Sequence, residues 1–152
     1  MTPGRRHLGW LVALTGFCVT GLTATPGAHH SFAMYDQTTT KTMTGKLVRL
    51  IPGSSHSQFV FDVVDAEGKP TEGPDGKPVK WQVEVGSAYN IARQGVTVKS
   101  FPSGTVFTVT LYPQRNGSNQ GAIAGQVVMC GTALPPGGCT PENGTIMKPP
   151  AN

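Results

Sequence analysis

The sequence predicts an all-β domain with one short helix, and three observations support this fold class. Five segments between residues 42 and 129 alternate apolar with polar side chains or are rich in β-branched residues, as strands are. Glycine and proline, 20 and 13 residues, punctuate the chain between them. After residue 28, residues 87–94 are the one good helix candidate. The chain of 152 residues suits one domain, which excludes a large multidomain enzyme.

Residues 1–28 have the layout of a secretory signal peptide. The basic start Arg5-Arg6-His7 precedes an uncharged run from Leu8 to Leu22, which is short and weakly apolar for a membrane span. Small residues then lead to two candidate cleavage sites, after Gly27 or after Ala28, of which we favour the second. We therefore expect a periplasmic or secreted protein that has no membrane span once the signal is removed.

The charge and cysteine content of the remaining chain narrow its chemistry further. Loss of Arg5 and Arg6 lowers the net charge from +4 to +2, too little for a nucleic-acid-binding surface. Cys130 and Cys139 are the two cysteines left, and an even pair in an exported chain indicates a disulfide. Zinc binding is the alternative, but further Cys or His ligands are lacking nearby.

The strands follow one another with clear boundaries. They are predicted at residues 42–51, 58–64, 79–85, 105–112 and 122–129. Their inward side chains would build the core: Phe59, Phe61, Val63, Val79, Trp81, Val83, Val85, Phe107, Val109, Leu111, Ile123, Val127 and Met129. Between the second and third strands, Glu67-Gly68-Lys69-Pro70 is echoed by Asp75-Gly76-Lys77-Pro78, which predicts a lengthened hairpin loop.

One helix separates the third strand from the fourth. Ser87 can cap its start and Gly95 can end it in a left-handed conformation. The resulting order, β-β-β-α-β-β, is that of a small five-stranded barrel of the oligonucleotide/oligosaccharide-binding (OB) type. We expect this OB-like barrel over residues 42–130, an extended N-terminal segment over residues 29–41, and a Pro- and Gly-rich tail without regular structure over residues 131–152.

Several short motifs occur in an order that resembles an uncharacterised bacterial family, catalogued as domain-of-unknown-function family 6152. These motifs are His29-His30-Ser31-Phe32, Tyr35-Asp36, Thr44-Gly45-Lys46-Leu47-Val48, Trp81, Glu84, Ala92-Arg93-Gln94-Gly95 and Tyr112-Pro113-Gln114-Arg115-Asn116-Gly117. The resemblance covers about residues 28–129 and implies a small exported protein with no assigned activity. The chain departs from the family pattern at Ser54-Ser55, before His56, and at Val96, after the helix.

The histidines near the predicted new N-terminus suggest a metal site. If His29 is first, its amine and imidazole can chelate one copper ion, and His56 could supply an opposing nitrogen. If Ala28 is first, the imidazole of His30 can complete a square-planar copper or nickel site with the amine and two amide nitrogens. We expect His29, His30 and His56 to bind copper or another transition metal. The alternative is that these histidines bind no metal: His29 and His30 would lie in a solvated stretch of chain and His56 in a turn.

A metal-independent binding function is the second hypothesis. Barrels of this type bind ligands across strands two and three. That outer face lacks aromatic side chains for base stacking, so we expect a protein or small-molecule ligand and no nucleic acid; its residues are Gln58, Val60, Asp62, Lys80, Gln82 and Glu84. We further expect a monomer.

Catalysis has little support in the sequence. Ser31, His30 and Asp36 are pieces of a hydrolytic triad but lie together on one irregular segment, and no nucleophile elbow or phosphate-binding glycine loop occurs. Asp62 and Glu84 are predicted to face solvent, whereas an acid–base pair would need burial. We therefore expect a protein that is not an enzyme.

Overall fold

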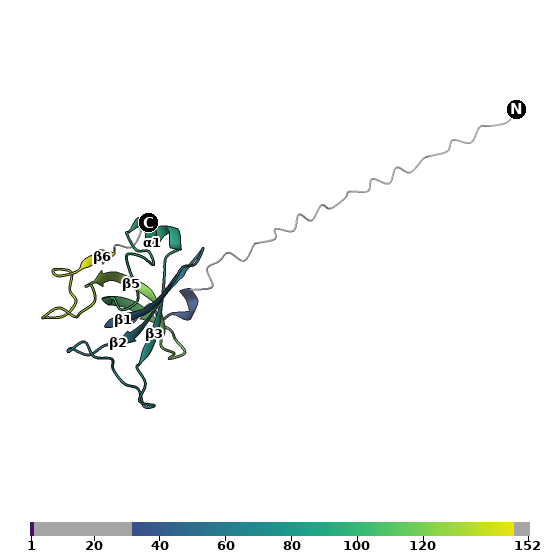
Figure 1. Cartoon of the computed structure of the whole chain (residues 1–152). Helices are drawn as coiled ribbons and strands as arrows, with labels where there is room; N and C mark the ends of the chain where they lie inside the picture. Colours follow the sequence, from purple (N-terminus) through teal and green to yellow (C-terminus); the bar gives the residue numbers. More distant parts are fainter. Residues whose placement is uncertain (2–31, 148–152) are drawn as a thin grey trace.

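The structure, a computed structural model, describes Met1 and residues 32–147 (Figure 1). A 3-10 turn comes first, and six strands and one α-helix follow it in this part of the chain. Their bounds are η1 Phe32–Met34, β1 Lys41–Ile51, β2 Ser57–Val63, β3 Lys80–Val85, α1 Ala88–Arg93, β4 Val106–Pro113, β5 Gln120–Met129 and β6 Thr145–Met147. The all-β class with one short helix is confirmed, and the first five strands lie where the sequence predicts them.

The strands form one sheet that closes on itself. The sheet order is β3-β2-β1-β4-β5-β6, and these neighbours pair antiparallel. β3 also pairs with β5 in parallel, through Gln82–Glu84 and Gln120–Ala122. This pairing closes β1–β5 into the predicted five-stranded barrel and so protects the backbone edges of β3 and β5.

The barrel interior is filled by the alternating apolar side chains of its strands. Phe59, Phe61 and Phe107 are fully buried and pack edge to face with ring centroids 5.1–6.0 Å apart. Phe101, from the loop after α1, joins them at 5.0 Å from Phe59. The predicted inward residues Val63, Val79, Ile123 and Met129 are only partly buried, but they pack against this core.

A close approach between β1 and β2 explains a glycine in the middle of a strand. Gly45 lies opposite Val63, and a Cβ atom at Gly45 would collide with the Phe61 ring and lie 2.9 Å from the carbonyl oxygen of Asp62. A side chain at this position would therefore force the two strands or the core ring apart.

The helix has the end signals that the sequence predicts. The Ser87 hydroxyl accepts a hydrogen bond from the Asn90 N–H at 3.2 Å, and Gly95 follows the helix with φ +82°. Ile91 points into the core. The Ala88 N–H donates to the carbonyl of Gly53 at 2.8 Å, which fastens α1 to the turn between β1 and β2.

The chain after β5 is more ordered than the sequence predicts. Residues 145–147 form β6, which pairs with the end of β5, and Met147 is buried in the core. Residues 131–152 had been expected to lack regular structure, so this strand corrects that expectation. A strand of three residues is too short to show a period, so β6 can be recognised only from its pairing with β5.

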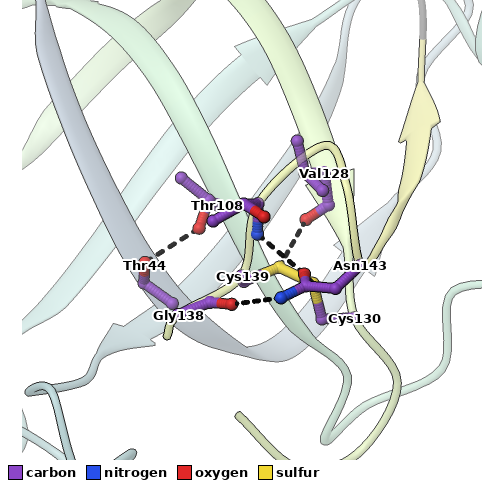
Figure 2. The surroundings of a disulfide bond; sticks show 8 residues. Thr44, Thr108, Val128, Cys130, Gly138, Cys139 and Asn143 are labelled. Atoms are coloured by element: carbon purple, nitrogen blue, oxygen red, sulfur yellow. Dashed lines mark hydrogen bonds between the residues drawn. A yellow bond between two sulfur atoms is a disulfide. The ribbon is translucent and has the colours of Figure 1, made fainter. Parts of the chain in front are cut away.

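Cys130 and Cys139 form the predicted disulfide, with 5.7 Å between their Cα atoms. Figure 2 shows the bridge beside the end of β5, together with Asn143, whose side-chain amide donates to the carbonyl of Gly138 at 2.8 Å. Cys139 is buried with Val106 and Val128. The bridge therefore holds the loop before β6 against the outside of the barrel. No helix within the described residues is both long and apolar enough to cross a membrane.

Candidate functional site

The imidazole of His56 is held in place by a carboxylate from another part of the barrel. His56 ends the turn that precedes β2, and Glu84 lies on β3, where it pairs with Gln58. Because side chains two residues apart share one face of a strand, His56, Gln58 and Glu84 all lie on the outer face. The Nδ1 atom of His56 is 3.0 Å from Oε1 of Glu84. The His56 side chain is 43% exposed and that of Glu84 only 18%.

Tyr35 is hydrogen-bonded to the second oxygen of the same carboxylate. Its hydroxyl donates a hydrogen bond to Oε2 of Glu84 at 2.9 Å, so both oxygens of Glu84 are engaged. Tyr35 itself is buried, and its backbone pairs with Gln114 after β4. Residues on either side are also tied to this stretch: the Asp36 N–H donates to Pro113 and the Arg115 N–H to Met34. The three side chains form a hydrogen-bonded chain that we call the His56–Glu84–Tyr35 cluster.

The surroundings of Tyr35 favour its neutral phenol. Burial, the hydrogen bond to Glu84 and the negative charge of Glu84, in that order, raise the pKa of Tyr35 to about 12. Next to it, hydrogen bonds from the Thr38 hydroxyl and N–H and from the Thr39 hydroxyl lower the pKa of Asp36. Tyr35 is thus a hydrogen-bond donor to Glu84 across the physiological pH range.

The cluster presents His56 as a metal ligand would be presented. With Nδ1–H donated to a carboxylate, the lone pair for coordination lies on Nε2, and the carboxylate makes that nitrogen more basic. Within residues 32–147, no side-chain or backbone group is hydrogen-bonded to Nε2 of His56. The same described part of the chain brings no three His, Cys, Asp or Glu side chains together in a way that could hold a metal ion. Any metal bound at His56 would thus need ligands from elsewhere in the chain.

Two of the predicted ligands, His29 and His30, lie outside the described residues. They precede Phe32 by three and two residues, so an extended chain lets them reach about 10 Å and 7 Å from it. The ring of Phe32 packs edge to face on Tyr35, with centroids 6.3 Å apart. The described chain therefore begins beside the His56–Glu84–Tyr35 cluster.

The two carboxylates considered for acid–base chemistry have different partners. Asp62 forms an ion pair with Lys80 on the outer face, while Glu84 binds His56 and Tyr35. The register places Asp62 opposite Lys80 and Glu84 opposite Gln58, so the carboxylates are four residue pairs apart along the hairpin. Both side chains are less exposed than the strand pattern predicts, at 18% for Glu84 and 22% for Asp62.

The roles of Glu84 and Tyr35 were not recognised from the sequence. Glu84 was placed correctly on an outer strand face, and Tyr35 belonged to a motif shared with the family. What joins them is the β2–β3 register and the bridge between Tyr35 and Gln114, which are long-range pairings. The sequence offered one signal: Tyr35 and Glu84 both belong to the motifs that resemble the family, and His56 lies between them in the chain.

Comparisons with known proteins agree with the resemblance noted above. No curated protein and no solved structure matches the chain. A family model described as a family of unknown function (DUF6152) matches residues 18–124, which include Tyr35, His56 and Glu84. The chain therefore belongs to this family of unknown function.

Proposed function

We propose that this protein is an exported, non-catalytic module that binds Cu(II) through its processed N-terminus and His56. The observation that carries the proposal is the 3.0 Å contact between Nδ1 of His56 and Glu84, which leaves Nε2 as the coordinating nitrogen. Tyr35 supports the orientation by donating to the other oxygen of Glu84.

The remaining ligands would come from the segment ahead of Phe32. If His29 is the first residue, its amine and imidazole supply two nitrogens and His56 supplies a third. Amine and imidazole nitrogens in a planar arrangement are the donors that Cu(II) prefers, and copper stands at the top of the affinity order for such a site. Phe32 follows His29 by three residues and packs on Tyr35 of the cluster, which supports a short path from the new N-terminus to this site.

Export supports the proposal because it creates the amine. The basic start, the apolar run and the small residues of segment 1–28 are typical of a secretory signal. The Cys130–Cys139 disulfide is of the kind that persists in oxidising compartments such as the periplasm. Both features favour a processed chain whose first residue carries a free amino group.

Intact-mass measurement and metal titration of the exported protein test this proposal. The chain is expressed with its own signal, purified from the periplasm, and weighed both natively and after denaturation. We expect a mass that starts at His29, one equivalent of tightly bound Cu(II), and an electron paramagnetic resonance spectrum of nitrogen ligation. His29→Ala and His56→Ala should each weaken binding, whereas Asp62→Asn, a charge change on the same outer face, should not.

Two comparisons identify the ligands. A variant with one Met added before His29 keeps every side chain but moves the amine, so it should lose affinity. If cleavage occurs after Gly27 instead, binding should depend on His30 and no longer on His56. Unchanged affinity in the Met-extended and His56→Ala proteins together would refute the proposed site.

A further inference from the structure

An apolar groove lies between α1, the segment after it and the end of β1. Its volume is about 200 Å³. Leu50, Ile91 and Val96 form its buried floor, and Pro52, Ala92 and Val98 stand at its rim. Small-molecule sites usually measure about 300–1,000 Å³, so the groove suits an inserted side chain better than a whole small ligand.

The segments that build the groove carry the two most exposed large apolar side chains within residues 32–147. Tyr89 is 71% exposed and Val98 60%. Arg93, one turn after Tyr89 on α1, lies 5.8 Å from the centre of the Tyr89 ring. Tyrosine and arginine are residue types that dominate the energy of protein–protein interfaces. Val98 lines the groove, and Tyr89 follows Ala88, another lining residue, in the chain.

The rim of the groove is positively charged. The exposed cations Arg49, Arg93 and Lys99 are each the sequence neighbour of a groove residue, namely Leu50, Ala92 and Val98. The segments that build the groove hold no acidic residue, because none occurs between Asp36 and Asp62 or between Glu84 and Glu142. Six of the eight acidic residues lie instead within residues 62–84. The charge around the groove therefore complements an acidic partner.

The walls of the groove are fixed by hydrogen bonds. Ala88 is bound to Gly53, as described above, and the Ser100 hydroxyl donates to the carbonyl of Gly95 at 2.5 Å. The same hydroxyl accepts from the Thr97 N–H at 2.9 Å. A preformed wall loses less conformational entropy than a flexible surface does when a partner binds.

We infer that this groove is the docking site of an acidic protein segment that inserts an aliphatic or aromatic side chain over Leu50, Ile91 and Val96. Carboxylates of the segment pair with Arg49, Arg93 and Lys99. The hollow shape favours a protein segment over a lipid surface, because a membrane offers no protruding side chain to fill it. The inference is independent of the proposed metal ligands, since none of these residues belongs to the His56–Glu84–Tyr35 cluster.

Nuclear magnetic resonance with defined peptides tests the docking site on the whole exported protein. The probes are acetylated hexapeptides of the pattern acidic-acidic-X-X-acidic-acidic, where X-X covers all pairs of Leu, Ile, Val, Phe, Tyr and Trp. Matched control peptides carry Ala-Ala at X-X or lysine at the acidic positions. We expect at least one X-X pair to shift the backbone amides of Ile91, Val96 and Val98, with binding that weakens as salt is added.

Two variants and one control locate the contact. Ala92→Met fills the hollow from an exposed helix position, and Arg93→Glu reverses the charge at its rim; each should weaken peptide binding at least tenfold. Arg115→Glu makes the same charge change at an exposed site outside the groove and should leave binding within about twofold of the parent, because screening limits distant charges.

Three results would overturn the inference. The first is that no peptide of the set shifts the groove amides. The second is equal binding of the Ala-Ala peptides, which would mean a charge effect without insertion. The third is binding to vesicles rich in phosphatidylglycerol that is tighter than peptide binding and indifferent to Ala92→Met, which would assign the face to a lipid surface. Copper titration of the same variants should be unchanged, so the two proposals fail separately.

Discussion

Nδ1 of His56 and Oε1 of Glu84 meet at 3.0 Å across the start of the β2–β3 pairing. A turn histidine and a strand carboxylate thereby become one unit, and the second oxygen of Glu84 is bound by Tyr35 from the start of the domain.

Removing the carboxylate should weaken metal binding without removing a ligand. In Glu84→Gln, the amide can still accept a hydrogen bond, but the negative charge that makes Nε2 of His56 a stronger donor is gone. We expect Cu(II) affinity to fall about 10- to 100-fold, the usual effect of such a change beside a metal ligand. Isothermal titration calorimetry measures it, with Asp62→Asn as the control. Equal losses in the two variants would point to net charge as the cause.

Tyr35 should ionise only in strongly alkaline solution. Its pKa is raised from 10.0 to about 12, so the folded chain retains the phenol proton while an unfolded chain loses it. Its contribution to stability is therefore complete below pH 10 and is lost as the pH rises toward 12. Ultraviolet titration of the folded protein should show a late phenolate step that Tyr35→Phe abolishes and Tyr112→Phe retains. Glu84→Gln should move this step only part of the way back, because burial of the ring remains.

The Cys130–Cys139 bridge should stabilise the domain modestly. It closes a short loop, and short loops place the effect at the lower end of about 2–4 kcal/mol. Urea unfolding of the double variant Cys130→Ser/Cys139→Ser should show this loss. Reductant should lower the stability of the parent toward that of the variant and leave the variant unchanged. A variant as stable as the oxidised parent would mean that β6 and Met147 hold the tail by themselves.

A methyl group at Gly45 should be costly. In Gly45→Ala the new Cβ meets the Phe61 ring and the carbonyl oxygen of Asp62, so strand or ring must shift. We expect a loss of about 1–3 kcal/mol in the free energy of unfolding, as overpacked cores show. Gly125→Ala on β5 is the matched control, because its nearest neighbour, Cβ of Thr110, lies at an ordinary 3.4 Å. Similar stability of both variants would show that β1 and β2 separate easily.

The strands were predictable because a strand that is buried on one face alternates apolar with polar residues in its sequence. Phe59 and Phe61, or Trp81 and Val83, are separated by polar residues that face outward. Ser87 and Gly95 identified the helix ends in the same local way. β6 was missed because three residues carry no period and Met147 is buried through contacts made by distant strands. Phe101 was missed for the same reason, since it enters the core from a loop.

The candidate site was predictable only in part. His56 was identified as a candidate metal ligand, but the residues near it in the sequence do not indicate which carboxylate contacts it. Glu84 reaches it through the β2–β3 register, and Tyr35 reaches Glu84 through a bridge to residue 114. The bridge from Tyr35 to Gln114 joins segments far apart in the chain, and the local pattern predicted the β2–β3 hairpin but not its register.

The parallel contact between β3 and β5 has a consequence for the candidate site. It spans Gln82–Glu84, so the residue that orients His56 is also part of the joint that turns an open sheet into a barrel. The backbone of Glu84 is thus held on both sides, by Gln58 of β2 and by Ala122 of β5. Closure of the barrel therefore leaves this carboxylate, and the imidazole bound to it, little room to move.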